Sequence, residues 1–179
     1  MNEIIKLLDY IISKEDETCL REEILPLIDK DYKNDKCYDY IKAMLLKGFK
    51  NSKEEAIYDK KYYELLSKSS QKGCKEAQYL VANRLYENKD YKNAMELYRK
   101  SALQGYANSQ WCYGIDLFNG IEGVLEKDEK EGLFFIELSA GQLYEYAIDF
   151  LIDLYKNGYG TIRANSNLYK RYKLISKWV

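Results

Sequence analysis

The side chains that could do chemistry in this chain are carboxylates and cysteines, because the sequence contains no histidine. Without histidine, Ser-His-Asp and Cys-His catalysis are excluded and the commonest metal ligand is missing. Asp149 and Asp153 lie four residues apart, so on a helix they would share one side and could exchange protons or hold a cation. A hard metal ion needs more oxygen ligands than this pair offers. We therefore interpret the pair as a solvated helix face, and we expect no catalytic residue, no metal site and no cofactor.

The cysteines are widely spaced and form no Cys-x-x-Cys motif. The first residues carry charges throughout and lack the uninterrupted apolar stretch of a secretory signal. No stretch approaches the roughly 18 uncharged apolar residues that would indicate a membrane-spanning helix. These features predict a cytoplasmic protein without membrane contacts, a setting in which disulfides are rare. We therefore expect reduced thiols at Cys19, Cys37, Cys74 and Cys112.

The composition favours an all-α chain that can bury a core. Hydrophobic residues make up 46% of the sequence and charged residues 32%, with only 10 glycines and one proline, Pro26. So few helix breakers predict helices joined by short turns rather than a β-sandwich or barrel. The 19 tyrosines suit a thin structure in which many side chains are half-buried, because a tyrosine ring is apolar and its hydroxyl is not.

The sequence repeats at intervals of 32 to 40 residues, a period typical of stacked helical repeats. Each repeat has a small residue near the start of its first predicted helix, and apolar residues follow four and eight positions later on the same helical face. The small residues, which we call anchors, are Cys37, Ala77, Ser109 and Ala147.

The second helix of each repeat has its own start and stop signals. Asp90 and Asp128 are placed to cap the N-termini of two such helices, because an aspartate side chain accepts hydrogen bonds from the first free backbone N–H groups. Gly73 and Gly105 stand where a left-handed residue would end a helix. The repeats therefore predict paired helices.

This pattern resembles the Sel1-like repeats, which are related to the tetratricopeptide repeats. The resemblance rests on Ala77 followed by Ser101-Ala102-Leu103-Gln104-Gly105, on Gly114, Gly120, Gly123 and Asp128 with Ser139-Ala140, and on Ala147 with Gly158-Tyr159-Gly160. It implies a right-handed α/α solenoid of paired antiparallel helices. The chain departs from the family pattern with Glu87-Asn88-Lys89-Asp90 in place of a glycine turn, with Leu143 in place of glycine, and with Ala164 in place of a capping aspartate.

The predicted organisation is an N-terminal helical cap over residues 1–35, with helices at 2–12 and 15–28, and a repeat array over 36–179 in one structural domain. The expected repeat units are about 36–72, 73–105, 106–142 and 143–179. Whether the cap only closes the array or also contributes to binding is left open by the sequence.

The net charge of −1 hides a strong segregation of charge along the chain. Residues 107–153 contain ten Asp and Glu but two Lys and Arg, a net charge of −8. The flanking segments 36–106 and 154–179 each carry a net charge of +6, and residues 1–35 carry −5. Either the stacked repeats neutralise one another, or the acidic block steers a basic partner towards the protein.

In the Sel1-like family, positions two, six and nine after each anchor point into the concave groove of the solenoid. The resemblance therefore implies matched aromatic side chains in the two middle repeats, with two carboxylates beside them. Tryptophan and tyrosine are typical anchors of protein interfaces. The expected partner-binding residues are Tyr79, Asn83, Tyr86, Trp111, Ile115, Phe118, Asp149 and Asp153.

The leading functional hypothesis is a non-enzymatic scaffold that binds a protein in this groove, in the form of an immunity protein that neutralises a basic toxin of the nuclease type. One alternative is a Sel1-like regulatory adaptor in a signalling or secretion complex. Another is an enzyme of the cysteine-rich branch of the family, which binds or hydrolyses β-lactams. Nucleic acid is not an expected partner, because the basic segment 170–177 is interpreted as the polar face of the last helix. A homodimer through an amphipathic terminal helix stays open.

Overall fold

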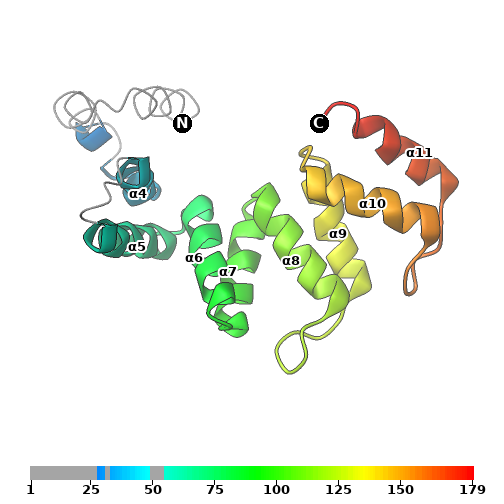
Figure 1. Ribbon diagram of the computed structural model, residues 1–179, viewed down its shortest axis with the longest axis horizontal. Coiled ribbons are helices and arrows are strands. Elements are labelled where there is room, and N and C mark those ends of the chain that lie inside the picture. Colours follow the sequence, from blue (N-terminus) through cyan, green and yellow to red (C-terminus); the bar gives the residue numbers. More distant parts are fainter. Residues whose placement is uncertain (1–27, 31–32, 49–54) are drawn as a thin grey trace. The chain divides into compact units, whose positions relative to one another are not determined.

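The computed structural model describes residues 28–30, 33–48 and 55–179 (Figure 1). The helix predicted at 2–12, almost all of the one predicted at 15–28 and Pro26 lie outside the described residues. Ile28 is helical and buried, with 3% of its surface exposed.

The described part of the chain is all-α, as predicted, and its helices alternate in two series. In that part, the only β-structure is two isolated bridges in turns, Ile121 with Leu125 and Tyr159 with Ile162. The first helices of the repeats are α4 (Tyr38–Gly48), α6 (Lys75–Glu87), α8 (Ala107–Asn119) and α10 (Glu145–Asn157). The second helices are α5 (Glu55–Gln71), α7 (Tyr91–Leu103), α9 (Glu129–Ala140) and α11 (Ser166–Ile175).

The predicted register holds for three of the repeats. Helices α6, α8 and α10 each begin two residues before their anchors, whereas α4 begins one residue after Cys37. The predicted units each contain one pair of helices, and the unit boundaries themselves stay a prediction.

Asp90 and Asp128 cap α7 and α9 as the sequence indicated, and the cap of α11 is the one that differs. The Asp90 side chain accepts a hydrogen bond from the backbone N–H of Asn93, and that of Asp128 accepts two, from Lys130 and Glu131. Ala164, which stands where the family has a capping aspartate, does not cap α11, and the next residue does so instead. The side chain of Asn165 caps α11 by accepting from the N–H groups of Asn167 and Leu168.

Left-handed residues end the second helices where glycine was expected. Gly73 has a φ of 90° and Gly105 a φ of 79°. Leu143 takes the same position after α9, with a φ of 64°. A left-handed leucine is strained because its Cβ crowds the backbone. The turn after α9 therefore keeps the conformation of the glycine turns but is less stable than they are.

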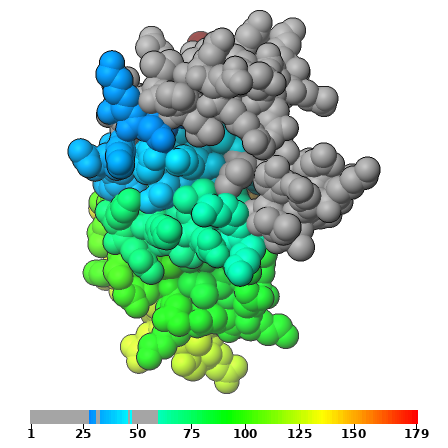
Figure 2. Space-filling view, turned by 90° about the vertical axis from the view of Figure 1, so that its left-hand side faces the viewer, coloured from blue at the N-terminus to red at the C-terminus, as the bar shows by residue number. Residues whose placement is uncertain are grey.

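The chain divides into two compact units, Met1–Val81 and Ala82–Val179, which we describe separately. In the first unit α4 packs on α5, and Figure 2 shows α4, in light blue, against the turquoise residues of α5. The buried residues of this unit cluster around two cysteines and comprise Cys37, Ala43, Leu65, Leu66, Cys74 and Ala77.

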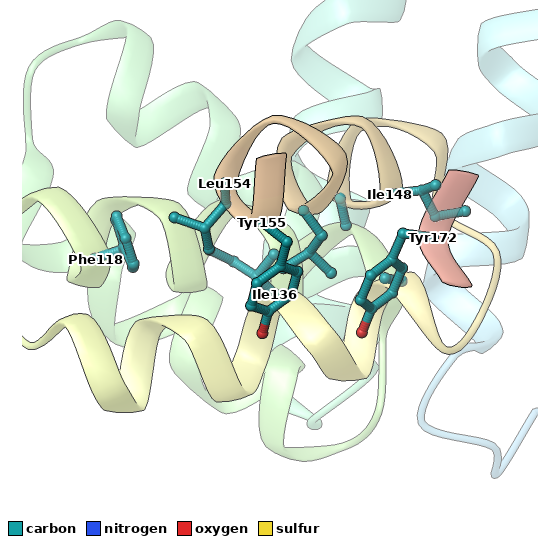
Figure 3. Packing of buried hydrophobic residues seen from close by; sticks show 9 residues of the cluster. Phe118, Ile136, Ile148, Leu154, Tyr155 and Tyr172 are labelled. Atoms are coloured by element: carbon teal, nitrogen blue, oxygen red, sulfur yellow. The ribbon is translucent and has the colours of Figure 1, made fainter. Parts of the chain in front are cut away.

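The core of the second unit lies between α8, α9, α10 and α11. Figure 3 shows it from close by, with the parallel rings of Tyr155 and Tyr172 stacked and both hydroxyls pointing towards α9. The Tyr155 hydroxyl donates a hydrogen bond of 2.7 Å to Oε1 of Glu137 on α9. The buried residues of this core are Phe118, Ile136, Ala140, Ala147, Ile148, Leu151, Leu154, Tyr155 and Tyr172.

Helices α8 and α9 touch through two glycines. A Cβ on Gly132 would lie 2.7 Å from the carbonyl oxygen of Gly114, and a Cβ on Gly114 would lie 3.0 Å from the carbonyl oxygen of Gly132. Two backbones can come this close only where neither residue has a side chain. This contact sets the distance between α8 and α9.

Serines that recur in the repeats form hydrogen bonds between neighbouring helices. The Ser139 hydroxyl donates to the backbone oxygen of Ala107 at 2.8 Å, and the Ser109 hydroxyl donates to the side-chain oxygen (Oγ) of Ser101 at 2.7 Å. All three serine side chains are buried, so these bonds satisfy groups that water does not reach. Among the described residues, no helix is both long and apolar enough to cross a membrane.

Candidate functional site

The predicted site residues are divided between the two units. Tyr79, half-buried on α6, belongs to the first unit. The second unit holds the other residues, from Asn83 and Tyr86 at the end of α6 to Asp149 and Asp153 on α10. The site is therefore built from the second unit, where the structure brings several of these side chains together.

A continuous row of aromatic rings runs through the second unit, and we call it the aromatic row. At its centre Trp111 of α8 contacts Tyr144 and Phe150, with ring centroids 6.4 and 5.9 Å apart. The row continues from Tyr144 to Tyr146 at 5.6 Å, and both outer tyrosines are exposed, Tyr146 at 64% and Tyr159 at 55%. In order, the row is Tyr146, Tyr144, Trp111, Phe150, Phe118 and Tyr159.

Phe118 is the one predicted site residue that the structure removes from the surface. Its exposure is 0%, and its ring lies between Phe150, at 5.4 Å, and Tyr159, at 5.7 Å. The expectation that Phe118 faces a partner is wrong, because the neighbouring repeat covers it. Figure 3 shows it at one end of the core cluster. Trp111 and Ile115, by contrast, are half-buried against the same core.

Tyr86 and Asn83 form a separate cluster. The Tyr86 ring packs edge-on against Tyr91 at 4.9 Å, and its hydroxyl donates a long hydrogen bond of 3.4 Å to Oδ1 of Asp116. Oδ1 of Asn83 accepts a hydrogen bond of 2.7 Å from the Tyr98 hydroxyl. Tyr86 and Phe118, both expected to face the groove, therefore do not share one aromatic surface, because the two rings belong to different clusters.

Asp116 and Cys112 lie one turn apart on α8, beside this cluster. Burial raises the pKa of Asp116 from 3.8 to about 6, although the hydrogen bond from Tyr86 acts in the opposite direction. Burial, and secondarily the charge of Asp116, raises the pKa of the Cys112 thiol to about 12. A thiol with so high a pKa is a poor nucleophile at neutral pH.

Replacing Asp116 with asparagine is expected to stabilise the protein at neutral pH. The folded-state pKa is raised, so the folded protein holds this proton more tightly than the unfolded chain, and stability falls as pH rises from about 4 to about 6. We expect a gain of about 1–2 kcal/mol above pH 6, after allowing for solvent screening of a half-buried group. Urea denaturation of both proteins from pH 4 to pH 7 measures it. Equal curves for the two proteins would contradict the prediction.

Asp149 and Asp153 lie exposed on α10, as their spacing predicted. Phe150 lies between them in sequence, and Asp153 follows it by three residues, so Asp153 neighbours this ring on the helix surface, whereas Asp149 neighbours Asp153. The acidic block is neutralised internally at one point. Glu129 forms an ion pair of 2.7 Å with Lys127 and accepts hydrogen bonds from Thr161, and these contacts lower its pKa to about 2.

The cysteines differ from the sequence expectation. Cys37 and Cys74 form a disulfide within the first unit, with their Cα atoms 5.0 Å apart, so the expected reduced thiols are wrong for these two residues. Cys112 is a free thiol, as expected. Cys19 lies outside the described residues. The folded chain brings together two cysteines 37 residues apart, a proximity that spacing alone does not reveal.

Sequence reasoning missed the aromatic residues of the last pair of helices. Phe150 stands three positions after the anchor Ala147, and Tyr144 stands three positions before it. The implied groove positions were two, six and nine, so neither residue was considered. The sequence did contain a clue to Phe150, because this aromatic residue lies between Asp149 and Asp153, which were both predicted as site residues.

No protein-family model matches the chain, and no curated protein matches its sequence. Two solved structures are similar to it. The first is c5321, a protective antigen present in uropathogenic Escherichia coli strains and displaying an SLR fold, with 21% identity and a TM-score of 0.67 over 82% of this chain and 31% of that one. The second is a Sel1 repeat protein from Oxalobacter formigenes, with 18% identity and a TM-score of 0.66 over 82% of this chain and 59% of that one.

The chain spans less than two thirds of the length of either protein. The likeness in structure agrees with the paired helices, the left-handed turns after the second helices and the anchors at the start of the first helices. The chain therefore has the all-α solenoid fold of the Sel1-like repeat proteins.

Proposed function

We propose that the chain is a non-enzymatic scaffold that binds a protein on the aromatic row, and that it acts as an immunity protein against a basic toxin of the nuclease type. The observation that carries the proposal is the half-buried pair of rings Trp111 and Phe150, together with the exposed carboxylates of Asp149 and Asp153 on the helix that carries Phe150. Large rings supply contact area, and carboxylates at their edge favour a positively charged partner.

The acidic charge supports the basic character of the partner. Exposed carboxylates of this block include Glu122, Glu126 and Glu145 in addition to the two on α10. A nuclease is basic where it binds the phosphate backbone. Opposite charges on two partners accelerate their encounter, and the acceleration falls as salt rises.

The experiment uses the full chain as immobilised bait for an extract of its native host. A retained protein is identified, purified and measured directly against wild type and variants. We expect Trp111→Ala to weaken its binding about 30-fold or more, as for an interface hot spot. Trp178→Ala is the matched control, because the second tryptophan of the chain is 80% exposed outside the aromatic row. Circular dichroism of each variant checks that the helices persist.

The immunity role is tested by the charge and the activity of the retained protein. We expect a basic protein with nuclease activity that the chain inhibits, and an association rate about tenfold lower for the Asp149→Asn/Asp153→Asn variant at low salt. A partner that is not basic, or a rate independent of salt, would contradict the immunity role. Equal binding by wild type and the Trp111 variant would contradict the aromatic row as the binding surface. A regulatory adaptor would instead retain components of a signalling or secretion complex.

A further inference from the structure

Three potential metal ligands meet at the centre of the first unit. The sulfurs of Cys37 and Cys74 and a carboxylate oxygen of Glu76 all lie within 4.8 Å of one another. Oε2 of Glu76 is 3.2 Å from Sγ of Cys74 and 3.6 Å from Sγ of Cys37. Both cysteines are buried, at 2% and 0% exposure, and Glu76 is half-buried. The sequence analysis expected no metal site and did not combine these residues.

The carboxylate of Glu76 is better matched to reduced sulfurs than to a disulfide. While Cys37 and Cys74 are joined, neither sulfur carries a hydrogen that it could donate to Oε2 of Glu76. Once reduced, each sulfur could donate a hydrogen bond to this oxygen, or all three atoms could bind one cation. The local chain holds Glu76 in place, because it stands in the first turn of α6, where a negative charge is favoured.

The ligand set and its spacing match zinc. Zn²⁺ combines thiolate and carboxylate ligands, at about 2.3 Å to sulfur and about 2.1 Å to oxygen. In a tetrahedron these bond lengths place sulfur and oxygen about 3.6 Å apart, and the two sulfurs about 3.8 Å apart. The two sulfur–oxygen distances are already close to this value. The disulfide bond is the one feature that must change before the ion can enter.

We propose that Cys37, Cys74 and Glu76 form a zinc site that becomes available when the disulfide is reduced. Two cellular thiols, or one dithiol, would supply two electrons and two protons. The protein S–S bond breaks, each sulfur gains a proton, and a disulfide forms in the reductant. Zn²⁺ then displaces the two thiol protons to solvent and binds both thiolates and Oε2 of Glu76. A water molecule completes the fourth position, as three protein ligands leave one open.

The site would keep the first unit joined in either redox state. Cys37 directly precedes α4 and Cys74 directly precedes α6, so a disulfide or a bound zinc ion ties the starts of the same two helices together. Reduced protein without metal lacks both links. The first unit would thus be stable in oxidising conditions and in reducing conditions that supply zinc, and weakened only when both links are missing.

The test uses the full chain in a Cys19→Ser/Cys112→Ser background, which leaves Cys37 and Cys74 as its only thiols. A phosphine reduces the disulfide, taking the oxygen of one water molecule to become a phosphine oxide, and a thiol assay confirms two free sulfurs. Metal is removed with a chelator, which is then dialysed away. We expect the reduced protein to bind one equivalent of Zn²⁺ by calorimetry and the oxidised protein to bind none. Cobalt(II) should give a thiolate-to-metal absorption band in the reduced protein only.

The variants separate the three ligands from general thiol binding. Cys37→Ser/Cys74→Ser should abolish binding, and Glu76→Gln should weaken it tenfold or more, whereas Glu87→Gln, at the far end of α6, should leave it unchanged. Equal zinc affinity of Glu76→Gln and the parent would overturn the proposal. So would zinc binding to the oxidised protein, no binding to the reduced one, or a disulfide that the phosphine cannot reach in the folded state.

Discussion

Gly132→Ala is expected to lower the free energy of unfolding by about 3 kcal/mol or more, at the upper end of the usual cost of overpacking. The added Cβ would lie 2.5 Å from the backbone nitrogen of Phe118 and 2.7 Å from the carbonyl oxygen of Gly114. These are backbone atoms of α8, which cannot rotate away as the end of a side chain can. Helices α8 and α9 would have to separate, and the core around Phe118 would open. Urea denaturation followed by circular dichroism measures the loss.

Gly141→Ala is the matched control for this substitution. Gly141 ends α9 with an ordinary right-handed φ of −62°, and a Cβ there would meet nothing closer than 3.4 Å. The control should be neutral, or stabilising by up to about 1 kcal/mol because alanine reduces the freedom of the unfolded chain. Equal effects at the two positions would show that α8 and α9 are not in tight contact.

Removing the Cys37–Cys74 disulfide is expected to cost about 4 kcal/mol of stability. The bond closes a loop with a sequence separation of 37, and the chain-entropy estimate for that length gives this value at room temperature. The loss should be local, because both cysteines belong to the core of the first unit. Hydrogen exchange of the α4 and α6 amides, measured with the wild type oxidised and then reduced in the presence of a chelator, reports it.

Cys37→Ala/Cys74→Ala should reproduce the loss, and Cys112→Ala is its control. Cys112 is a free, half-buried thiol of the second unit, so its replacement should leave the exchange of α4 unchanged. Protection of α4 that persists after full reduction, with chelator present, would contradict a stabilising role for the disulfide. The chelator matters, because a bound zinc ion would replace the link that reduction removes.

The fold was predictable because its determinants are local. The side chains of Asp90 and Asp128 cap α7 and α9 from within their own turns, and the left-handed φ values of Gly73 and Gly105 follow from their place after α5 and α7. The spacing from Ala77 to Ser109 reappears as the interval between the starts of α6 and α8. Each of these features depends on residues a few positions apart, so it can be derived from the sequence.

The candidate site was only partly predictable, because exposure depends on the neighbouring repeat. The resemblance to the Sel1-like repeats placed Trp111, Ile115 and Phe118 in the groove, and in the structure all three belong to or pack against one core. The resemblance could not show that Phe150 and Tyr159 would cover Phe118 while Trp111 stays half-exposed. Asp149 and Asp153 were predictable as an exposed pair, because their four-residue spacing places both on the same polar face of α10.

The sequence by itself determined the helices, their caps, their period and the segregation of charge, since all of these follow from residue order and composition. Only the tertiary structure decided which aromatic rings are buried, that Gly114 and Gly132 touch, and that Cys37 meets Cys74 beside Glu76. The physical reason is distance along the chain. Contacts between residues 18 to 41 positions apart depend on how one helix packs on the next, and the helical period of a single segment does not contain that information.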